Sequence, residues 1–305
     1  MKRIQVISGS RADAGLLEMP RKELEKSFEV RYHEMWGMSP DQAFRRADSV
    51  MNENEPDCVL ILGDRFEIVQ VALAAHLRRI PIAHLCGGDV SLGSYDDVHR
   101  DCISRLAKWH FVTSWGSRCE LSLKFGKYPH WDVSKLHMVG NIALDYIMHG
   151  DWRGVRPYAE PYVVVSYQPE TIDGTVEWDA VVSAIGGRQV CFIRPNADAG
   201  SDQINALIDE YTGDCDVPFR NLPRAEFLNL LYHCDEFIGN SSAMLYEAPA
   251  LGVKCRMIGK RQQGRVAPTG DGKASERIKE VLCRELLYLP RPASIMAALF
   301  PMLSR

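Results

Sequence analysis

Aspartates in the first half of the chain stand where proton transfer could be carried out. Asp64 follows directly after the apolar run 58–62, and Asp96 and Asp97 precede a stretch that is predicted to be helical. Desolvation in a closing cleft raises the pKa of a carboxyl group from about 4 toward neutrality, where it can exchange a proton. An aspartate at a helix start can also serve only as an N-cap. We predict that Asp64 and Asp96 transfer protons and that Asp97 caps the helix.

The second half carries residues that suit an anion site. The segment 239–242, Gly-Asn-Ser-Ser, follows an apolar run and precedes a predicted helix, so backbone N–H groups and the helix dipole would meet a phosphate there. Ser241 or Ser242 could instead be an ordinary N-cap. The segment 260–265 favours the phosphate, because its arginines, at the end of a neighbouring strand, complement a diphosphate. Glu247, further along the helix, could accept hydrogen bonds from ribose hydroxyls.

The first predicted strand ends in Gly9-Ser10-Arg11-Ala12-Asp13. This turn indicates either a helix capped by Asp13 or a second anion contact through Arg11. The dinucleotide fingerprint G-x-G-x-x-G is absent, so no NAD and no other cofactor is predicted. The nine cysteines contain no C-x-x-C pair, so neither a zinc site nor a disulfide framework is predicted.

The elements that must position these residues follow a βαβ rhythm that occurs twice. Short apolar, β-branched runs alternate with longer amphipathic stretches, as in parallel sheets covered by helices on both faces. The predicted strands are 3–8, 58–62, 81–85, 110–113, 162–166, 189–193, 236–238 and 254–258. Gly and Pro residues in 148–161 mark an interdomain linker. We predict an α/β fold of two Rossmann-like, doubly wound domains, residues 1–150 and 151–305, that face a cleft lined by the strand ends.

Composition limits the class of partner. The 305 residues are 46% hydrophobic and 25% charged, with a formal net charge of −4, which suits a globular protein without a basic field for nucleic acid. A small acidic ligand is the expected partner. The N-terminus has no signal-peptide pattern and no apolar run is long enough to span a bilayer, so a cytoplasmic protein without membrane contact is expected.

Several motifs follow one another over nearly the whole chain: Gly9-Ser10-Arg11-Ala12-Asp13, Gly63-Asp64-Arg65-Phe66-Glu67, His84-Leu85-Cys86-Gly87-Gly88-Asp89, Tyr95-Asp96-Asp97, Val139-Gly140-Asn141, the segment 196–202, Gly239-Asn240-Ser241-Ser242, Glu247-Ala248-Pro249 and the segment 259–265. Together and in this order, they resemble the motifs of the hydrolysing UDP-N-acetylglucosamine 2-epimerases, in the branch of the sialic-acid pathway.

The resemblance implies the glycosyltransferase-B architecture, with catalytic carboxylates and the sugar at residues 1–150 and UDP held mainly by residues 151–305. It implies removal of the C2 proton, anti elimination of UDP to a glycal, and addition of water that releases N-acetylmannosamine or a derivative. The catalytic carboxylates map onto Asp64 and Asp96. The expected UDP-sugar contacts are Arg11, Asn196, Asp198, Asn240, Ser241, Ser242, Glu247, Arg261 and Arg265. Relatives suggest a homodimer or homotetramer.

Departures from the family pattern fall on the sugar side. Gln168 replaces the histidine of a strand-end H-P-E-T, and an amide exchanges no proton near neutral pH. Cys86 replaces a glutamate or histidine, and Asp101 stands in place of a histidine. Gln168 and Cys86 are therefore included among the catalytic positions. A UDP-sugar glycosyltransferase on the same fold and a non-catalytic UDP-sugar binder remain alternatives to the 2-epimerase.

Overall fold

The computed structural model describes residues 1–94, 96–195, 200–212 and 222–289. The chain divides into two compact units, and each is described here by itself. The first unit comprises Met1–Asp89, Val98–Ile142 and the chain from Lys273 onward, and the second comprises Val90–Asp97 and Ala143–Gly272. The division thus differs from the expected 1–150 and 151–305. Residues 90–97, from the first half of the chain, belong to the second unit, and the chain from Lys273 onward belongs to the first.

The first unit contains one six-stranded parallel sheet with the strand order β2-β1-β3-β4-β5-β6. Its strands are β1 (Arg3–Ser8), β2 (Glu29–Glu34), β3 (Cys58–Leu62), β4 (Ile82–Leu85), β5 (Trp109–Val112) and β6 (Leu136–Met138). Its helical elements are α1 (Arg11–Glu25), α2 (Pro40–Asn54), α3 (Phe66–Leu77), most of α4 (Asp96–Leu106), α5 (Trp115–Phe125), η1 (Val133–Lys135) and α12 (Ala274–Leu287).

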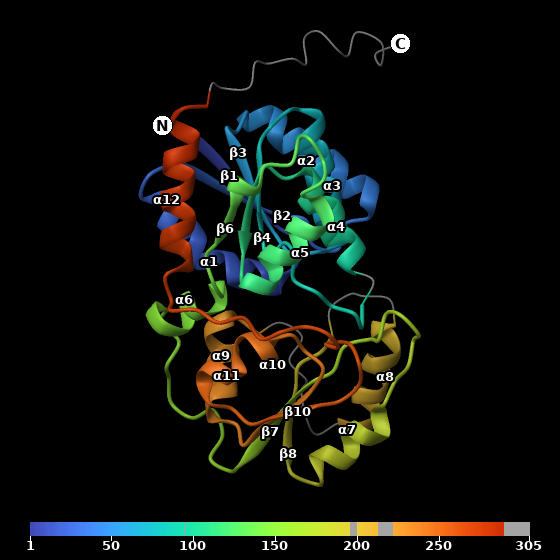
Figure 1. Ribbon diagram of the computed structural model, residues 1–305. Coiled ribbons are helices and arrows are strands. Elements are labelled where there is room, and N and C mark those ends of the chain that lie inside the picture. The colour runs from blue at the N-terminus through green and yellow to red at the C-terminus, as the bar shows by residue number, and fades with distance from the viewer. Residues whose placement is uncertain (95, 196–199, 213–221, 290–305) are drawn as a thin grey trace. The chain divides into compact units, whose positions relative to one another are not determined.

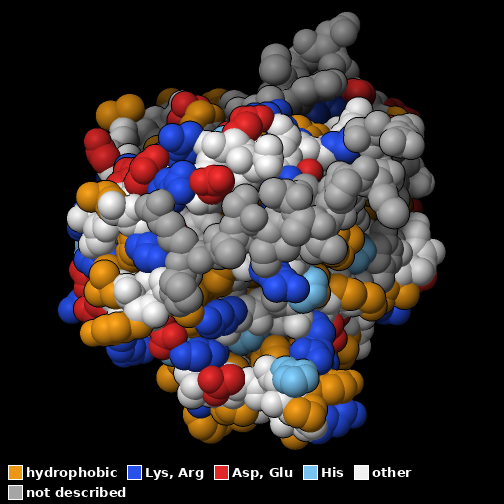
Figure 2. All heavy atoms as spheres, turned by 90° about the horizontal axis from the view of Figure 1, so that it is seen from above, with side chains coloured by type: hydrophobic (Ala, Val, Ile, Leu, Met, Phe, Trp, Pro, Cys, Tyr) orange, Lys and Arg blue, Asp and Glu red, His pale blue; other side chains and the backbone are white. Residues whose placement is uncertain are grey.

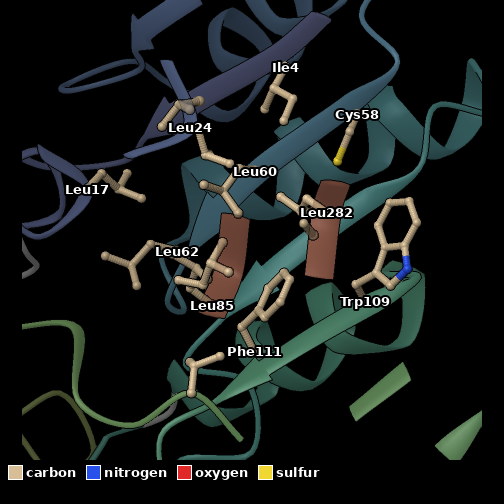
Figure 3. Packing of buried hydrophobic residues seen from close by; sticks show 14 of the residues in the cluster. Ile4, Leu17, Leu24, Cys58, Leu60, Leu62, Leu85, Trp109, Phe111 and Leu282 are labelled. Carbon is tan, nitrogen blue, oxygen red and sulfur yellow. The ribbon is translucent and has the colours of Figure 1, made fainter. Parts of the chain in front are cut away.

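Both faces of this sheet are covered by helices. On one face, α1 and α12 pack against the strands (Figure 1). Residues of α12 spaced four apart, from Ala274 to Leu286, form its buried stripe, as in an amphipathic helix. Figure 3 shows Leu282 of this helix among Leu60, Leu62 and Leu85 of the strands. On the other face, α2, α3 and α4 enclose a second apolar cluster.

The second unit contains a four-stranded parallel sheet with the order β10-β9-β7-β8. Its strands are β7 (Tyr162–Ser166), β8 (Gln189–Phe192), β9 (Glu236–Gly239) and β10 (Cys255–Met257). The helices are most of α6 (Ile142–His149), α7 (Trp178–Ile185), α8 (Ser201–Thr212), α9 (Arg224–His233), α10 (Ala243–Tyr246) and α11 (Ala248–Leu251). Helices α7 and α8 bury one face of the sheet, while α9, α10 and α11 bury the other.

The predicted α/β fold with two parallel sheets is confirmed, and each of the predicted strands has a counterpart. Two observed strands, β2 and β6, were not predicted. Both lie at the edges of the first sheet, where one side of a strand is not covered by a neighbour. The sequence of β2, Glu-Val-Arg-Tyr-His-Glu, is accordingly polar and only half-buried, and β6 is three residues long.

The interdomain linker predicted at 148–161 is wrong as placed. The chain passes between units at Ile142 and Ala143, and the following segment belongs to the second unit. Trp152 is buried there, and the N–H of Gly154 donates to Asn229 Oδ1 of α9 at 2.9 Å. Glycines that interrupt the helical pattern therefore mark a surface loop that is tied to a helix.

Charged groups are mixed on the surface. Figure 2 shows Lys and Arg side chains among Asp, Glu and hydrophobic groups on the face turned to the viewer. This distribution agrees with a formal net charge of only −4. Among the described residues, no helix combines the length and apolar character needed to cross a lipid bilayer.

Candidate functional site

Asp64 lies in the turn between β3 and α3 of the first unit, and its partner is a buried arginine. The Arg100 side chain is 2% exposed and donates from Nη2 to Asp64 Oδ2 and from Nη1 to the carbonyl of Asp89. A guanidinium group keeps its charge in proteins and stabilises a neighbouring carboxylate in the ionised form. Arg100 therefore favours the ionised form of Asp64, which lies at the carboxyl end of a strand of the sheet.

His84 on β4 fixes the backbone beside Asp64. Its Nε2 lies 2.8 Å from the carbonyl oxygen of Gly63, and its Nδ1 lies 3.0 Å from Ser104 Oγ. Because a carbonyl only accepts hydrogen bonds, Nε2 carries the proton and Nδ1 accepts from the serine. Burial lowers the pKa of His84 to about 4, so the ring is neutral near pH 7. It positions the turn rather than supplying charge.

Cys86 begins the tight turn after β4. Its φ of 62° lies in the left-handed region, which is uncommon for a residue with a side chain, and the residue is 9% exposed within the core cluster of the first unit. Two residues on, a Cβ on Gly88 would lie 2.2 Å from the carbonyl oxygen of Ser117. Asp89 accepts from the hydroxyls of Thr113 at 2.6 Å and Ser117 at 2.7 Å. The turn is thereby fixed against the start of α5.

The turn after β1 differs from the expected cap. Ser10, not Asp13, is the N-cap of α1, since its Oγ accepts from the backbone N–H of Asp13 at 3.2 Å. Asp13 is thus the third helical residue and its carboxyl is available for another role. Arg11 is exposed, with its guanidinium carbon 5.6 Å from the centre of the Trp36 ring.

In the second unit, Gln168 and Asn240 join the ends of β7 and β9. The N–H of Gln168 donates to Asn240 Oδ1 at 2.6 Å, and Asn240 Nδ2 donates to the carbonyl of Gln168 at 2.9 Å. Gln262 Nε2 donates to the carbonyl of Asn240 at 2.7 Å. The Asn240 side chain, which is fully buried, therefore holds the backbone of Gln168 in place.

The segment 90–97 packs within the second unit. The backbone N–H of Ser91 donates to both carboxylate oxygens of Asp97, at 3.0 and 2.9 Å, so Asp97 closes this loop. Asp96 accepts from Ser94 Oγ at 2.6 Å, and its Oδ2 lies 3.9 Å from Arg261 Nη2. Asp96 thus belongs to the second unit, together with all of the predicted UDP-sugar contacts except Arg11.

The loop after β10 is tied to the turn after β7. Glu170 is buried, and its Oε1 accepts from the backbone N–H groups of Lys260 at 2.7 Å and Arg261 at 3.3 Å. The guanidinium of Arg261 also donates to the carbonyl of Pro169. These backbone N–H groups, which could have bound a phosphate, hold a carboxylate of the protein, so an anion here would meet the arginine side chain.

The helix expected after Ser242 is short. Helix α10 has four residues, Ala243–Tyr246, and the Ser242 side chain makes no capping hydrogen bond. Ser241 Oγ accepts from the N–H of Ala243 at 3.3 Å. Since the dipole of a helix sums over aligned peptides, a helix of four residues provides only a small part of the dipole that was predicted to act on an anion here.

Glu247 has a buried cationic partner that the sequence analysis missed. Its Oε1 lies 3.1 Å from Arg224 Nη1, and both side chains are less than a tenth exposed. The Arg224 guanidinium carbon lies 5.4 Å from the centre of the Tyr146 ring. Arg265, another predicted contact, donates from Nη1 to Gln262 Oε1 at 3.1 Å. A ribose at Glu247 would share the carboxylate with Arg224.

Comparison with known proteins shows to which family the chain belongs. The family described as UDP-N-acetylglucosamine 2-epimerase matches residues 32–276, which is most of the chain. The chain belongs to this UDP-N-acetylglucosamine 2-epimerase family. A relative from Campylobacter jejuni named GDP/UDP-N,N'-diacetylbacillosamine 2-epimerase (hydrolyzing) is 26% identical over 80% of this chain and 70% of its own length. Polysialic acid biosynthesis protein P7 of Escherichia coli is 31% identical over 70% of this chain.

The epimerase family also shares the fold. The structure of the Methanocaldococcus jannaschii UDP-GlcNAc 2-epimerase in complex with UDP-GlcNAc and UDP superposes with a TM-score of 0.72, covering 92% of this chain and 99% of that one at 16% identity. The match to the E. coli relative spans 58% of that protein's length.

Most of the positions predicted to contact the substrate lie among the described residues. Asn196 and Asp198, predicted to contact the substrate, lie outside the described residues. Among the residues that are described, no group of three or more His, Cys, Asp and Glu side chains could hold a metal ion. The sequence analysis missed Arg100, Glu170 and Arg224 as partners. Arg100 and Glu170 stand beside motifs that the sequence showed, whereas Arg224, the first residue of α9, stands beside none.

Proposed function

We propose that the protein is a hydrolysing UDP-sugar 2-epimerase that releases UDP and a 2-epimerised amino sugar, N-acetylmannosamine or a derivative with a further N-acetyl group. Membership of the epimerase family carries this proposal. The second product class is included because the C. jejuni relative is named for N,N'-diacetylbacillosamine. The Asp64–Arg100 pair supports it further, because elimination and hydration both require an ionised carboxylate at the sugar.

We assign the two half-reactions to different aspartates. Asp96, beside Arg261, removes the proton at C2 while the C1–O bond breaks and its electron pair leaves with UDP. Asp64, which Arg100 keeps ionised, accepts the proton of the water that then adds at C1. This order places the elimination base next to the cation that stabilises the leaving diphosphate.

UDP is proposed to bind the second unit through cations and hydroxyls. Arg261, Arg265, Ser241 and Ser242 provide the diphosphate contacts, and Glu247 provides the ribose contact. Arg265 is supported by its position over the Tyr246 ring, with its guanidinium carbon 5.7 Å from the ring centre, a contact that restricts the orientation of its side chain.

Incubation with UDP-N-acetylglucosamine or UDP-N,N'-diacetylbacillosamine in deuterated water tests the reaction. We expect UDP release without any acceptor, together with deuterium at C2 of the free sugar. UDP release that depends on an added acceptor, with C2 unlabelled, would establish the glycosyltransferase alternative. Binding without release of UDP would identify a non-catalytic binder.

Asparagine substitutions test the assigned bases. Asp64→Asn and Asp96→Asn keep the side-chain shape but accept no proton, so turnover should fall by about a hundredfold or more while UDP affinity stays nearly unchanged. Steady-state UDP release and UDP titrations measure both quantities. Asp41→Asn is the control, since Asp41 lies exposed in the first turn of α2. Wild-type turnover in both site variants would contradict the assignment.

A further inference from the structure

A second carboxyl group lies beside Asp64 in the first unit. Asp13 stands in the first turn of α1, and although the residue is partly exposed, its Oδ2 atom is buried and has no hydrogen-bond partner. An unpaired oxygen that is shielded from water is costly when it carries negative charge and far less costly on a protonated carboxyl. The buried oxygen therefore favours the protonated form of Asp13, whereas Arg100 favours the ionised form of Asp64.

Packing of the turn after β1 sets the surroundings of Asp13. A Cβ on Gly9 would lie 2.9 Å from Ile68 Cγ1 and 3.3 Å from Arg65 Cβ, so this turn presses against the start of α3. The charged groups that act on Asp13 from there are Arg65, Asp64 and Glu67.

Arg65, the one cation among these three groups, also binds the buried carboxylate of Glu67. Arg65 binds Glu67 with Nε–Oε2 3.2 Å and Nη2–Oε1 3.3 Å, and Glu67 is 1% exposed. Burial raises the pKa of Asp13 to about 7, against the lowering effects of Arg65 and of the Ser10 hydrogen bond, and with added repulsion from Asp64 and Glu67. A carboxyl group that is protonated near neutral pH can serve as an acid.

We propose that Asp13 is the proton donor for the hydration of the glycal, a task that the neutral amide of Gln168 cannot perform as an acid near neutral pH. The inference rests on the proposed 2-epimerase function. In this step the O–H bond of Asp13 breaks and its proton bonds to C2 through the electron pair of the C1=C2 double bond. The oxygen of water bonds to C1, and the proton released from that water passes to the Asp64 carboxylate. The environments of the two aspartates fix their roles, because Arg100 holds one as an anion and the unpaired buried oxygen holds the other as an acid.

Direct titration tests the proton on Asp13 without any substrate. Infrared difference spectra of wild type minus Asp13→Asn, recorded across pH 4 to pH 9, should contain one protonated carboxyl band that disappears around pH 7. A band that disappears near pH 4, where exposed aspartates titrate, would overturn the proposal.

Kinetics test the donor role. In Asp13→Asn we expect UDP release to continue while the glycal accumulates, with hydration slowed by about a hundredfold, and in Asp13→Glu we expect hydration to recover. Hydration by the wild type should decline above pH 7, and the Asn variant should lack this decline. Asp41→Asn should behave as wild type. Equal hydration by wild type and Asp13→Asn, with the same pH profile, would overturn the donor role, whereas a wild type that forms neither glycal nor C2-labelled sugar would overturn the proposed function itself.

Discussion

Gln168 is the residue at which this chain departs most clearly from the proton chemistry that its family resemblance implies. Its backbone is held by Asn240, and its Nε2 lies 3.4 Å from Ser166 Oγ. We predict that Gln168→His raises acceptor-independent formation of the free 2-epimerised sugar, because an imidazole adds a second acid for the hydration step near neutral pH. Gln263→His, on an exposed position of the same unit, is the control for a histidine added elsewhere. A loss confined to acceptor-dependent release would favour the glycosyltransferase.

The raised pKa of Asp13 predicts that the free energy of unfolding depends on pH. Its pKa is raised in the folded state, to about 7, from an unfolded value near 4. The folded state therefore binds the proton more tightly, so the stabilisation is fully present below about pH 4 and is lost as the pH rises to about 7. Asp13→Asn should gain stability relative to wild type between pH 4 and pH 7, with a constant difference above. Chemical unfolding at several pH values measures this, and a difference that does not change with pH would contradict it.

At the scale of elements, the turn after β4 depends on a residue without a side chain. Gly88 has a φ of 78° and lies against the carbonyl of Ser117, so Gly88→Ala combines an unfavourable backbone conformation with a clash and should cost about 2 kcal/mol or more of the free energy of unfolding. Gly37→Ala is the matched control, since Gly37 has a φ of 65° but open space around it, and should cost about 1 kcal/mol. Equal losses of unfolding free energy in the two variants would show that the close contact of Gly88 with Ser117 of α5 adds nothing to the cost of the substitution.

Local patterns predicted the central strands because these strands are continuous apolar runs with both faces covered. They did not predict the polar edge strand β2, whose stability comes from pairing with β1. Asp64 was recognised because it follows such a strand. Its partner Arg100 could not be, since the two are 36 residues apart and only the folded sheet and α4 bring them together. Glu170 likewise meets the loop after β10 across 90 residues.

At the scale of the whole molecule, ligand binding to the second unit should stabilise the protein. UDP at about a hundred times its dissociation constant adds roughly 2.7 kcal/mol to the free energy of unfolding if it binds only the folded state. We predict a rise in Tm with UDP for wild type that is lost in Arg261→Ala and retained in Arg153→Ala, an exposed arginine of the same unit. An equal rise in all three proteins would remove Arg261 from the UDP site.

Helix α12 has a consequence for how the protein is made. The helix completes a core whose strands and α1 lie near the N-terminus, yet it follows the entire second unit in the chain. During synthesis, one apolar face of the first sheet therefore stays only partly covered until about 130 further residues have been added. Synthesis proceeds at roughly 5 to 20 residues per second. The second unit can fold first, from a contiguous stretch and the short segment 90–97. Nascent chains arrested before Ala274 should bind chaperones that recognise exposed apolar surface, and chains arrested well beyond Leu287 should release them.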